Sequence, residues 1–109
     1  MSKKILAACE AFSTGNAEKA LPLIADSVEW HIVGDHSIVG KAGVEETCAE
    51  AAAQGNPNFE NGRVITSKSH IIVEGQDFDT DVHYCDIYTI EDGLIQEITS
   101  YCLAPAGEE

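Results

Sequence analysis

Residues 80–90 read Thr-Asp-Val-His-Tyr-Cys-Asp-Ile-Tyr-Thr-Ile and carry the clearest structural signal in the chain. Side chains alternate between the two faces of a strand, so the even-numbered positions of this run share one face. Most of that face is apolar or aromatic, and it consists of Thr80, Val82, Tyr84, Asp86, Tyr88 and Ile90. The pattern therefore predicts a half-buried strand over 78–91, with the acidic Asp86 in the middle of its apolar face.

Three more strands are expected around this one. A period of two begins after residue 60 and predicts strands near 62–74 and 94–103, and Glu91-Asp92-Gly93 is typical of a hairpin turn before the last of them. A first strand is expected over 28–33. There, Trp30 belongs to an apolar side, and strict alternation turns His31 to the opposite face.

Apolar residues at helical spacing predict three helices in the first half of the chain. They cover 5–12, 17–24 and 44–51. Pro22 lacks a backbone donor, so the second helix is expected to be short or bent. The alanines near the end of the third helix suit close packing on a sheet. Helices followed by long antiparallel strands are typical of an α+β domain in which the helices cover one face of the sheet.

Length and charge limit the classes of protein to consider. The 109 residues have room for a single domain, 1–109, with one core. Nineteen Asp and Glu against six Lys and Arg give a net charge of −13. Such a surface repels phosphate backbones and anionic lipids, so we expect neither nucleic acid nor a membrane as a partner. No run approaches the roughly 20 apolar residues of a membrane span, and the first residues do not fit a signal peptide, so we expect a cytoplasmic protein.

The cysteines and histidines show no metal-binding pattern. Cys9, Cys48, Cys85 and Cys102 are far apart and form no C-x-x-C pair, so in a reducing compartment they are expected to be small buried hydrophobic side chains. The four histidines show no diagnostic ligand spacing. The sequence therefore predicts neither a metal nor a cofactor.

Asp86 and His31 are the candidates for chemistry. An ionised carboxylate on an apolar face is costly, so Asp86 must find a partner, take up a proton or line a wet cavity. A neutral carboxyl group there would act as a general acid or donate a hydrogen bond to a developing oxyanion. The alternative is a structural Asp86 that caps a backbone group or pairs with a neighbouring strand. An imidazole side chain such as that of His31 suits proton transfer, and a structural role is its alternative as well.

Several segments, taken in their order along the chain, resemble one family. The run Trp30-His31-Ile32-Val33-Gly34, with Ile38-Val39-Gly40 and Gly43-Val44 after it, resembles the Trp-His-x-Pro-Gly…Leu-x-Gly…Gly segment of SnoaL-like proteins. The run from Tyr84 through Asp92-Gly93-Leu94-Ile95 to Ser100-Tyr101 resembles their last hairpin. These proteins belong to the superfamily of nuclear transport factor 2 and ketosteroid isomerase.

The resemblance implies a cone-shaped fold, in which three N-terminal helices pack on a strongly bent antiparallel sheet that opens at one end to an apolar cavity. It also implies a homodimer. His31 falls where ketosteroid isomerase has its general base, and Asp86 where that enzyme keeps a neutral aspartic acid as oxyanion donor. Ala8 stands in place of the isomerase's oxyanion tyrosine. The alignment points His31 into the cavity, which requires a bulge in the first strand.

Two functions follow, and the residues leave both open. In the first, a small hydrophobic molecule binds in the apolar cavity, and an isomerase, lyase or polyketide-cyclase-like enzyme uses His31 as base and Asp86 as neutral acid or oxyanion donor. The residues expected to line that cavity are Trp30, Tyr84, Tyr88 and Tyr101. In the second, the same fold is a non-catalytic ligand-binding or dimerisation module, which a cavity filled by packed rings would favour. A protein-recognition role of the outer sheet face is a third option.

Overall fold

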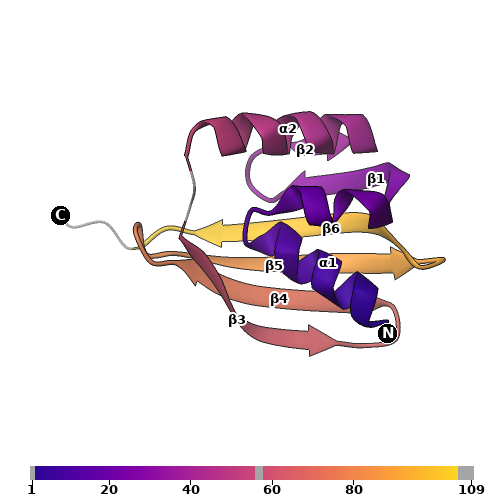
Figure 1. The fold of residues 1–109 in the computed structure, drawn as a ribbon. Coiled ribbons are helices and arrows are strands. Elements are labelled where there is room, and N and C mark those ends of the chain that lie inside the picture. The colour runs from indigo at the N-terminus through magenta and orange to yellow at the C-terminus, as the bar shows by residue number, and fades with distance from the viewer. Residues whose placement is uncertain (1, 56–57, 106–109) are drawn as a thin grey trace.

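The computed structural model describes residues 2–55 and 58–105, which form a six-stranded sheet with two helices on one of its faces (Figure 1). The strands are β1 (Ile24–Ile32), β2 (Ser37–Val39), β3 (Phe59–Thr66), β4 (His70–Asp77), β5 (Val82–Glu91) and β6 (Leu94–Leu103). Their spatial order is β2-β1-β6-β5-β4-β3. The β1–β6 pair is parallel and the other pairs are antiparallel, so the sheet is mixed rather than wholly antiparallel as expected.

The strand expected over 62–74 is in fact two antiparallel strands, β3 and β4. Residues 67–69 form the turn between them, which the Ser67 N–H closes by donating to the His70 carbonyl at 2.9 Å. This turn, Ser-Lys-Ser, contains no Gly, Pro, Asn or Asp, and serine is a weaker turn former than these, so the local signal for a turn is weak. The strand expected from residue 78 begins at Val82, because the Asp77 carboxylate accepts hydrogen bonds from the Asp79 N–H and the Thr80 hydroxyl and closes a turn there.

The first expected helix is confirmed as α1 (Lys3–Ser13), which buries Ile5, Ala8, Cys9 and Phe12. The prediction of a second helix over 17–24 is wrong. Residues 17–24 contain two short 3-10 turns, Ala17–Lys19 and Leu21–Leu23, and Ile24 already begins β1. Pro22 explains the difference, since it cannot supply the backbone donor that a continuing α-helix needs. The described residues therefore hold two α-helices, not three N-terminal ones.

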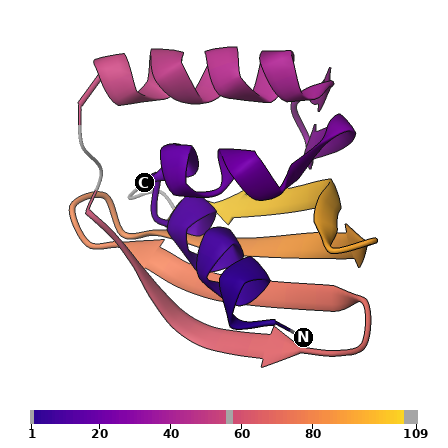
Figure 2. The ribbon, with the colours of Figure 1, turned by 45° about the vertical axis from the view of Figure 1, so that its right-hand side comes forward.

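The third expected helix is confirmed as α2 (Lys41–Ala53), but it does not pack as expected. Only Val44 of this helix is buried, and the alanines at 51–53 are exposed. α2 packs on β1 and β2, at one edge of the sheet, whereas α1 lies across β3 and β4 (Figure 2). The alanine-rich end of α2 is therefore not buried against the sheet.

We call the sheet face that α1 and α2 cover the inner face, and the opposite one the outer face. The hydrophobic core lies between α1 and the inner face. Its fully buried sheet residues are Val28, Ile71, Val73, Tyr88, Ile95 and Ile98.

The hairpin between β5 and β6 is confirmed, with Asp92 and Gly93 both at positive φ (54° and 74°), as a two-residue turn of this type requires. Beyond the turn the pairing shifts by one residue. Ile90 pairs with Ile95, but Thr89 pairs with Glu97, so Gln96 is an extra residue in β6. This bulge decides which β6 side chains reach the inner face.

All four cysteines are free, and only Cys9 is buried, so the expectation of four buried thiols is correct for one of them. The pKa of the Cys9 thiol is raised to about 12, and burial is the largest cause. Among the described residues, neither α-helix has the length and apolar character needed to cross a bilayer.

Candidate functional site

Asp86 lies on the inner face in the middle of β5, with only 7% of its surface exposed. Directly opposite it on β6 is Ser100, which is also buried. Ser13, the last residue of α1, donates a hydrogen bond from Oγ to Asp86 Oδ2 at 2.7 Å. The C-terminal end of α1 and the middle of the β5–β6 ladder therefore meet at one carboxyl group.

Two aromatic side chains complete a hydrogen-bonded network around Asp86. The Tyr88 hydroxyl lies 2.6 Å from Ser13 Oγ, and Trp30 Nε1 donates to Ser100 Oγ at 2.9 Å. When Asp86 is ionised, the single Ser13 hydroxyl hydrogen points to it, and the Tyr88 hydroxyl then donates to Ser13. We call these five side chains (Ser13, Trp30, Asp86, Tyr88 and Ser100) the Asp86 network.

Burial raises the pKa of the Asp86 carboxyl group above its ordinary value. Hydrogen bonds from Ser100 and Ser13 act in the opposite direction and do not cancel this effect. Burial, with the Asp86 charge as the next cause, raises the pKa of Tyr88 well above its ordinary value, so the tyrosine stays neutral at physiological pH. The carboxyl group is therefore the member of the network that takes up a proton most readily.

The network has two hydrogen-bonded arms, Ser13–Tyr88 and Ser100–Trp30, and they respond differently when Asp86 takes up a proton. The Trp30 indole can only donate, so it holds Ser100 as a donor toward the carboxyl group. Ser13 has no such restriction, because the Tyr88 hydroxyl beside it can either donate or accept. A neutral Asp86 would donate to Ser13, whose own hydrogen would turn to Tyr88. The Ser13–Tyr88 arm is thus reversible and the Trp30–Ser100 arm is fixed.

Asp86 also marks the border between the packed core and the open end of the inner face. On one side, the neighbouring inner-face pair is Tyr88–Ile98, and both residues are fully buried. On the other side, the neighbouring pair is Tyr84–Cys102, and Cys102 is exposed. Exposure of the inner face therefore begins at Cys102, one inner-face pair beyond Asp86.

Three of the four predicted ligand-binding residues lie on the inner face, where their rings are already packed. The Phe12 ring meets the Trp30 ring edge to face at a centroid distance of 5.0 Å and the Tyr88 ring at 6.1 Å. Tyr84 donates from its hydroxyl to Asn61 Oδ1 at 2.8 Å. Its ring lies over Gly75, where any Cβ would overlap it, so this glycine makes room for the tyrosine.

The fourth predicted residue, Tyr101, does not lie on the inner face, which corrects its expected place beside Asp86. It pairs with Cys85, so it points to the outer face, and 43% of its surface is exposed. The bulge at Gln96 is the reason. An uninterrupted ladder from Glu91–Leu94 would have placed Tyr101 opposite Tyr84, on the inner face.

His31 also lies on the outer face, so the structure does not bring it together with Asp86. In the β1–β6 ladder His31 pairs with Thr99, whereas its neighbour Trp30 pairs with the inner-face residue Ile98. The expected inward turn of His31 is therefore corrected, and strict alternation describes its position. The only register shift in this pairing lies between Ile24 and Glu29, before the histidine, and it leaves the outward direction unchanged.

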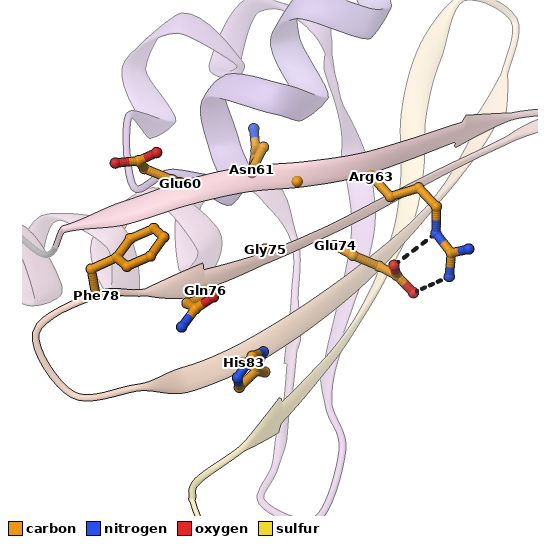
Figure 3. Close-up of a pocket in the computed structure, with 9 residues that line it drawn as sticks. Glu60, Asn61, Arg63, Glu74, Gly75, Gln76, Phe78 and His83 are labelled. Carbon is orange, nitrogen blue, oxygen red and sulfur yellow. Dashed lines mark hydrogen bonds and ion pairs between the residues drawn. The ribbon is translucent and has the colours of Figure 1, made fainter.

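The described structure has two shallow hollows on the sheet, and neither is lined by Asp86. The first, of about 260 Å³, lies over β3, β4 and β5, and Figure 3 shows its Arg63 and Glu74 side chains joined by an ion pair. The second, of about 280 Å³, has His83, Cys85, Tyr101 and Leu103 on its lining. Their charged and outer-face lining differs from the apolar cavity expected around Asp86.

Sequence reasoning missed the two serines that hold Asp86. Ser13 lies eight positions after Ile5, on the apolar stripe of α1, so a hydroxyl at a core-facing position was a usable signal. Ser100 had no such signal, because an unbroken hairpin would have paired Asp86 with Thr99. Only the bulge places Ser100 there.

Comparison with known proteins identifies one family. The model of the SnoaL-like domain matches residues 5–98. A solved NTF2-like protein from Cytophaga hutchinsonii is 31% identical, superposes with a TM-score of 0.82, and the match covers 94% of this chain and 99% of that one. No protein with a curated description matches the chain.

Two more distant structures share the fold. One is a candidate ketosteroid isomerase from Kribbella flavida, with 18% identity, a TM-score of 0.72 and coverage of 97% of this chain and 80% of that one. The other is a candidate polyketide cyclase from Sinorhizobium meliloti, with 14% identity, a TM-score of 0.72 and coverage of 92% and 94%. The NTF2-like α+β fold expected from the sequence is thereby confirmed.

Proposed function

The chain belongs to the SnoaL-like domain family, and from this premise we propose that it binds a small, mainly apolar molecule on the inner face of its sheet, beside Asp86. The observation that carries the proposal is a nearly buried carboxyl group whose pKa is raised, one residue pair from the exposed Cys102. Perturbed pKa values cluster at functional sites, which makes such a carboxyl group a candidate for one.

Asp86 supplies the polar contact in this proposal. In its neutral form it donates a hydrogen bond to a carbonyl oxygen of the ligand, and the bond strengthens as negative charge develops on that oxygen. The reversible Ser13–Tyr88 arm keeps the carboxyl group partnered when no ligand is present. Proton-transfer chemistry of the isomerase, lyase or polyketide-cyclase type is the reaction class that fits such a donor.

His31 does not act on the same molecule in this proposal, because it lies on the other face of the sheet. The proton acceptor is therefore Asp86 itself. Its ionised form takes a proton from the carbon beside the carbonyl group, and the neutral acid so formed then donates a hydrogen bond to the enolate oxygen or returns the proton to carbon. A single carboxyl group with a raised pKa can serve both steps. The candidate isomerase and cyclase with this fold suggest ligands with an enolisable carbonyl group.

The test uses two properties of Asp86, binding and proton transfer. Binding of 4-nitrophenol, an aromatic oxyanion, is followed by its absorption, and exchange of deuterium into 1-indanone is followed by NMR in D₂O. We expect the unmodified protein to bind the phenol and to accelerate the exchange, and Asp86→Asn to lose most of the acceleration. Asp92→Asn, a change in the exposed hairpin turn, is the matched control and should leave both unchanged.

Equal exchange rates for the Asp86→Asn and Asp92→Asn proteins would refute the catalytic part of the proposal. Absence of phenol binding at millimolar concentration by the folded protein would refute the binding part.

The second candidate function is a non-catalytic module on the same fold. One observation favours it: among the described residues no buried polar side-chain atom lacks a hydrogen-bond partner, and the rings around Asp86 are packed on one another. In that case Asp86 only joins α1 to the sheet. The exchange assay separates the two functions, because a module of this kind would not accelerate exchange above the rate in buffer.

A further inference from the structure

The outer face of the sheet carries a second cluster of titratable side chains, distinct from the Asp86 network. Glu29 and His31 are two residues apart on β1 and point to the same side, and Glu97 is their neighbour on β6. One ligand-type atom from each of the three lies within 4.8 Å of the others. We call these residues the outer-face triad.

The two glutamates of the triad lie opposite each other in the sheet, and a cation between them would offset the repulsion of their charges. Glu29 and Glu97 are direct partners in the β1–β6 ladder, and like charges in directly opposite positions destabilise a sheet. No lysine or arginine in residues 2–55 and 58–105 forms an ion pair with either carboxylate. His31 is the only basic partner, with Nε2 at 2.9 Å from Glu97 and 3.4 Å from Glu29.

The histidine is oriented by a residue outside the triad. Ser37, on β2, forms a hydrogen bond with His31 Nδ1 at 2.8 Å. A hydrogen bond at the far nitrogen fixes the ring and leaves Nε2 free to act as a ligand, as is usual for histidines that bind metals. Three neighbouring strands thus combine to aim one imidazole nitrogen at two carboxylates.

The distances and the charge fit a divalent transition metal. With Zn–N and Zn–O bonds of about 2.0–2.2 Å, ligand atoms of a tetrahedral zinc site are about 3.3–3.5 Å apart. The His31–Glu29 distance is already 3.4 Å, and the His31–Glu97 contact needs to open only slightly. A divalent ion with two carboxylates and a neutral imidazole is electrically neutral, whereas a protonated His31 alone would leave one negative charge.

We propose that Glu29, His31 and Glu97 bind one divalent transition-metal ion, with zinc as the best match, on the outer face of the sheet. Imidazole and carboxylate together suit zinc better than calcium or magnesium, which prefer oxygen ligands alone. The triad is partly exposed, with side-chain exposures of 33%, 54% and 44% for His31, Glu29 and Glu97, so water can complete the coordination. The bound ion would join β1 to β6, the one parallel pair of the sheet.

Titration with ZnCl₂, followed by NMR of the histidine side chains, tests the proposal. The chain provides internal references in His36, His70 and His83, which lie outside the triad. We expect the His31 imidazole signals to shift first and to saturate at one equivalent. Because the readout is residue-specific, zinc bound at a cysteine would not be mistaken for zinc at the triad.

Three variants and one control define the site. Glu29→Gln and Glu97→Gln each remove a ligand charge and should weaken zinc binding at His31 by on the order of tenfold or more, and Ser37→Ala should weaken it by roughly tenfold through the lost orienting contact. Glu50→Gln, an exposed residue of α2, is the charge-matched control and should leave it unchanged. Zinc should also raise the thermal midpoint of the parent protein and of the control variant, but not that of Glu97→Gln.

The opposite results would overturn the proposal. If His31 is only a protonated bridge between two glutamates, zinc will shift all four histidines alike or none of them, and the glutamine variants will match the control. Circular dichroism of each variant establishes that it is folded. The test is independent of the Asp86 network, so either proposal can fail without the other.

Discussion

At the scale of single residues, the chemistry of the inner face depends on how Asp86 is held. Its carboxyl group has lost most of its water but keeps two hydroxyl neighbours, Ser13 and Ser100. Desolvation favours the neutral form and hydroxyl donors favour the ionised form, and desolvation is the larger effect here. The fold therefore stabilises the neutral carboxyl group, which is the form able to donate.

This balance predicts how stability depends on pH. The pKa of Asp86 is raised in the folded protein, so its stabilising contribution is fully present below the unfolded pKa of 3.8 and is lost as pH rises through the folded pKa. The Asn side chain of the Asp86→Asn variant cannot ionise, so the stability of that variant does not fall with pH through this position. We therefore expect the free energy of unfolding of the parent, relative to that of Asp86→Asn, to decrease as pH rises above about 4 and through the folded pKa.

Urea denaturation of both proteins across this pH range measures the difference. Asp92→Asn, in the exposed turn, controls for the loss of one negative charge from an acidic chain. A difference that stays constant or grows with pH would mean that the carboxyl group is not stabilised in its neutral form.

At the scale of elements, α1 and α2 hold the sheet with unequal strength. α1 buries four apolar side chains and Ser13 in the core, whereas α2 buries only Val44 fully and packs Cys48 against the core in part. The exposed alanines at 51–53 place the C-terminal half of α2 outside the core. Val44 is thus the main anchor of the helix that packs on β1 and β2, and the partly buried Cys48 adds to it.

Shortening the Val44 side chain should loosen the helix. Val44→Ala removes two buried methyl groups and should lower the free energy of unfolding by about 2 kcal/mol. Ala52→Gln, at an exposed position of the same helix, should change it by less than about 0.5 kcal/mol. Chemical denaturation measures both, and hydrogen exchange of the α2 amides should increase in Val44→Ala. Equal stabilities of the two variants would show that Val44 does not anchor the helix.

At the scale of the whole molecule, the outer face is open and partly apolar. Ile65, Tyr101 and Leu103 lie on it, with exposures of 42%, 43% and 70%. The homodimer expected from the family resemblance stays a prediction, and this face is where we propose that a second copy of the chain would pack.

Sedimentation velocity tests the dimer. We expect a dimer at micromolar concentration, and we expect Leu103→Glu to shift the population toward monomer because it buries a charge in the interface. Ala52→Glu, at an exposed position of α2 on the opposite side of the sheet, is the control and should remain dimeric. A monomeric parent protein at high micromolar concentration would rule out this assembly.

Much of the architecture could be predicted from the sequence because the signals are local. The apolar stripe of α1, the Asp92-Gly93 turn and the alternation around Asp86 are all present within short windows. Pro22 correctly indicated that the second helix would be short or bent. The structure has only two 3-10 turns there, and β1 begins directly after them. The turn at 67–69 is not predicted, because Ser-Lys-Ser carries only a weak turn signal.

The sequence alone determined that Asp86 would lie on a buried, aromatic face, because alternation along one strand needs no partner. Only the tertiary structure decided what surrounds it. The bulge at Gln96 shifts β6 by one residue, and this single shift brings Ser100 to Asp86, turns Tyr101 to the outer face and places Glu97 beside His31. A bulge is stabilised by the packing of the whole sheet rather than by its own residues, which is why no local pattern could reveal it.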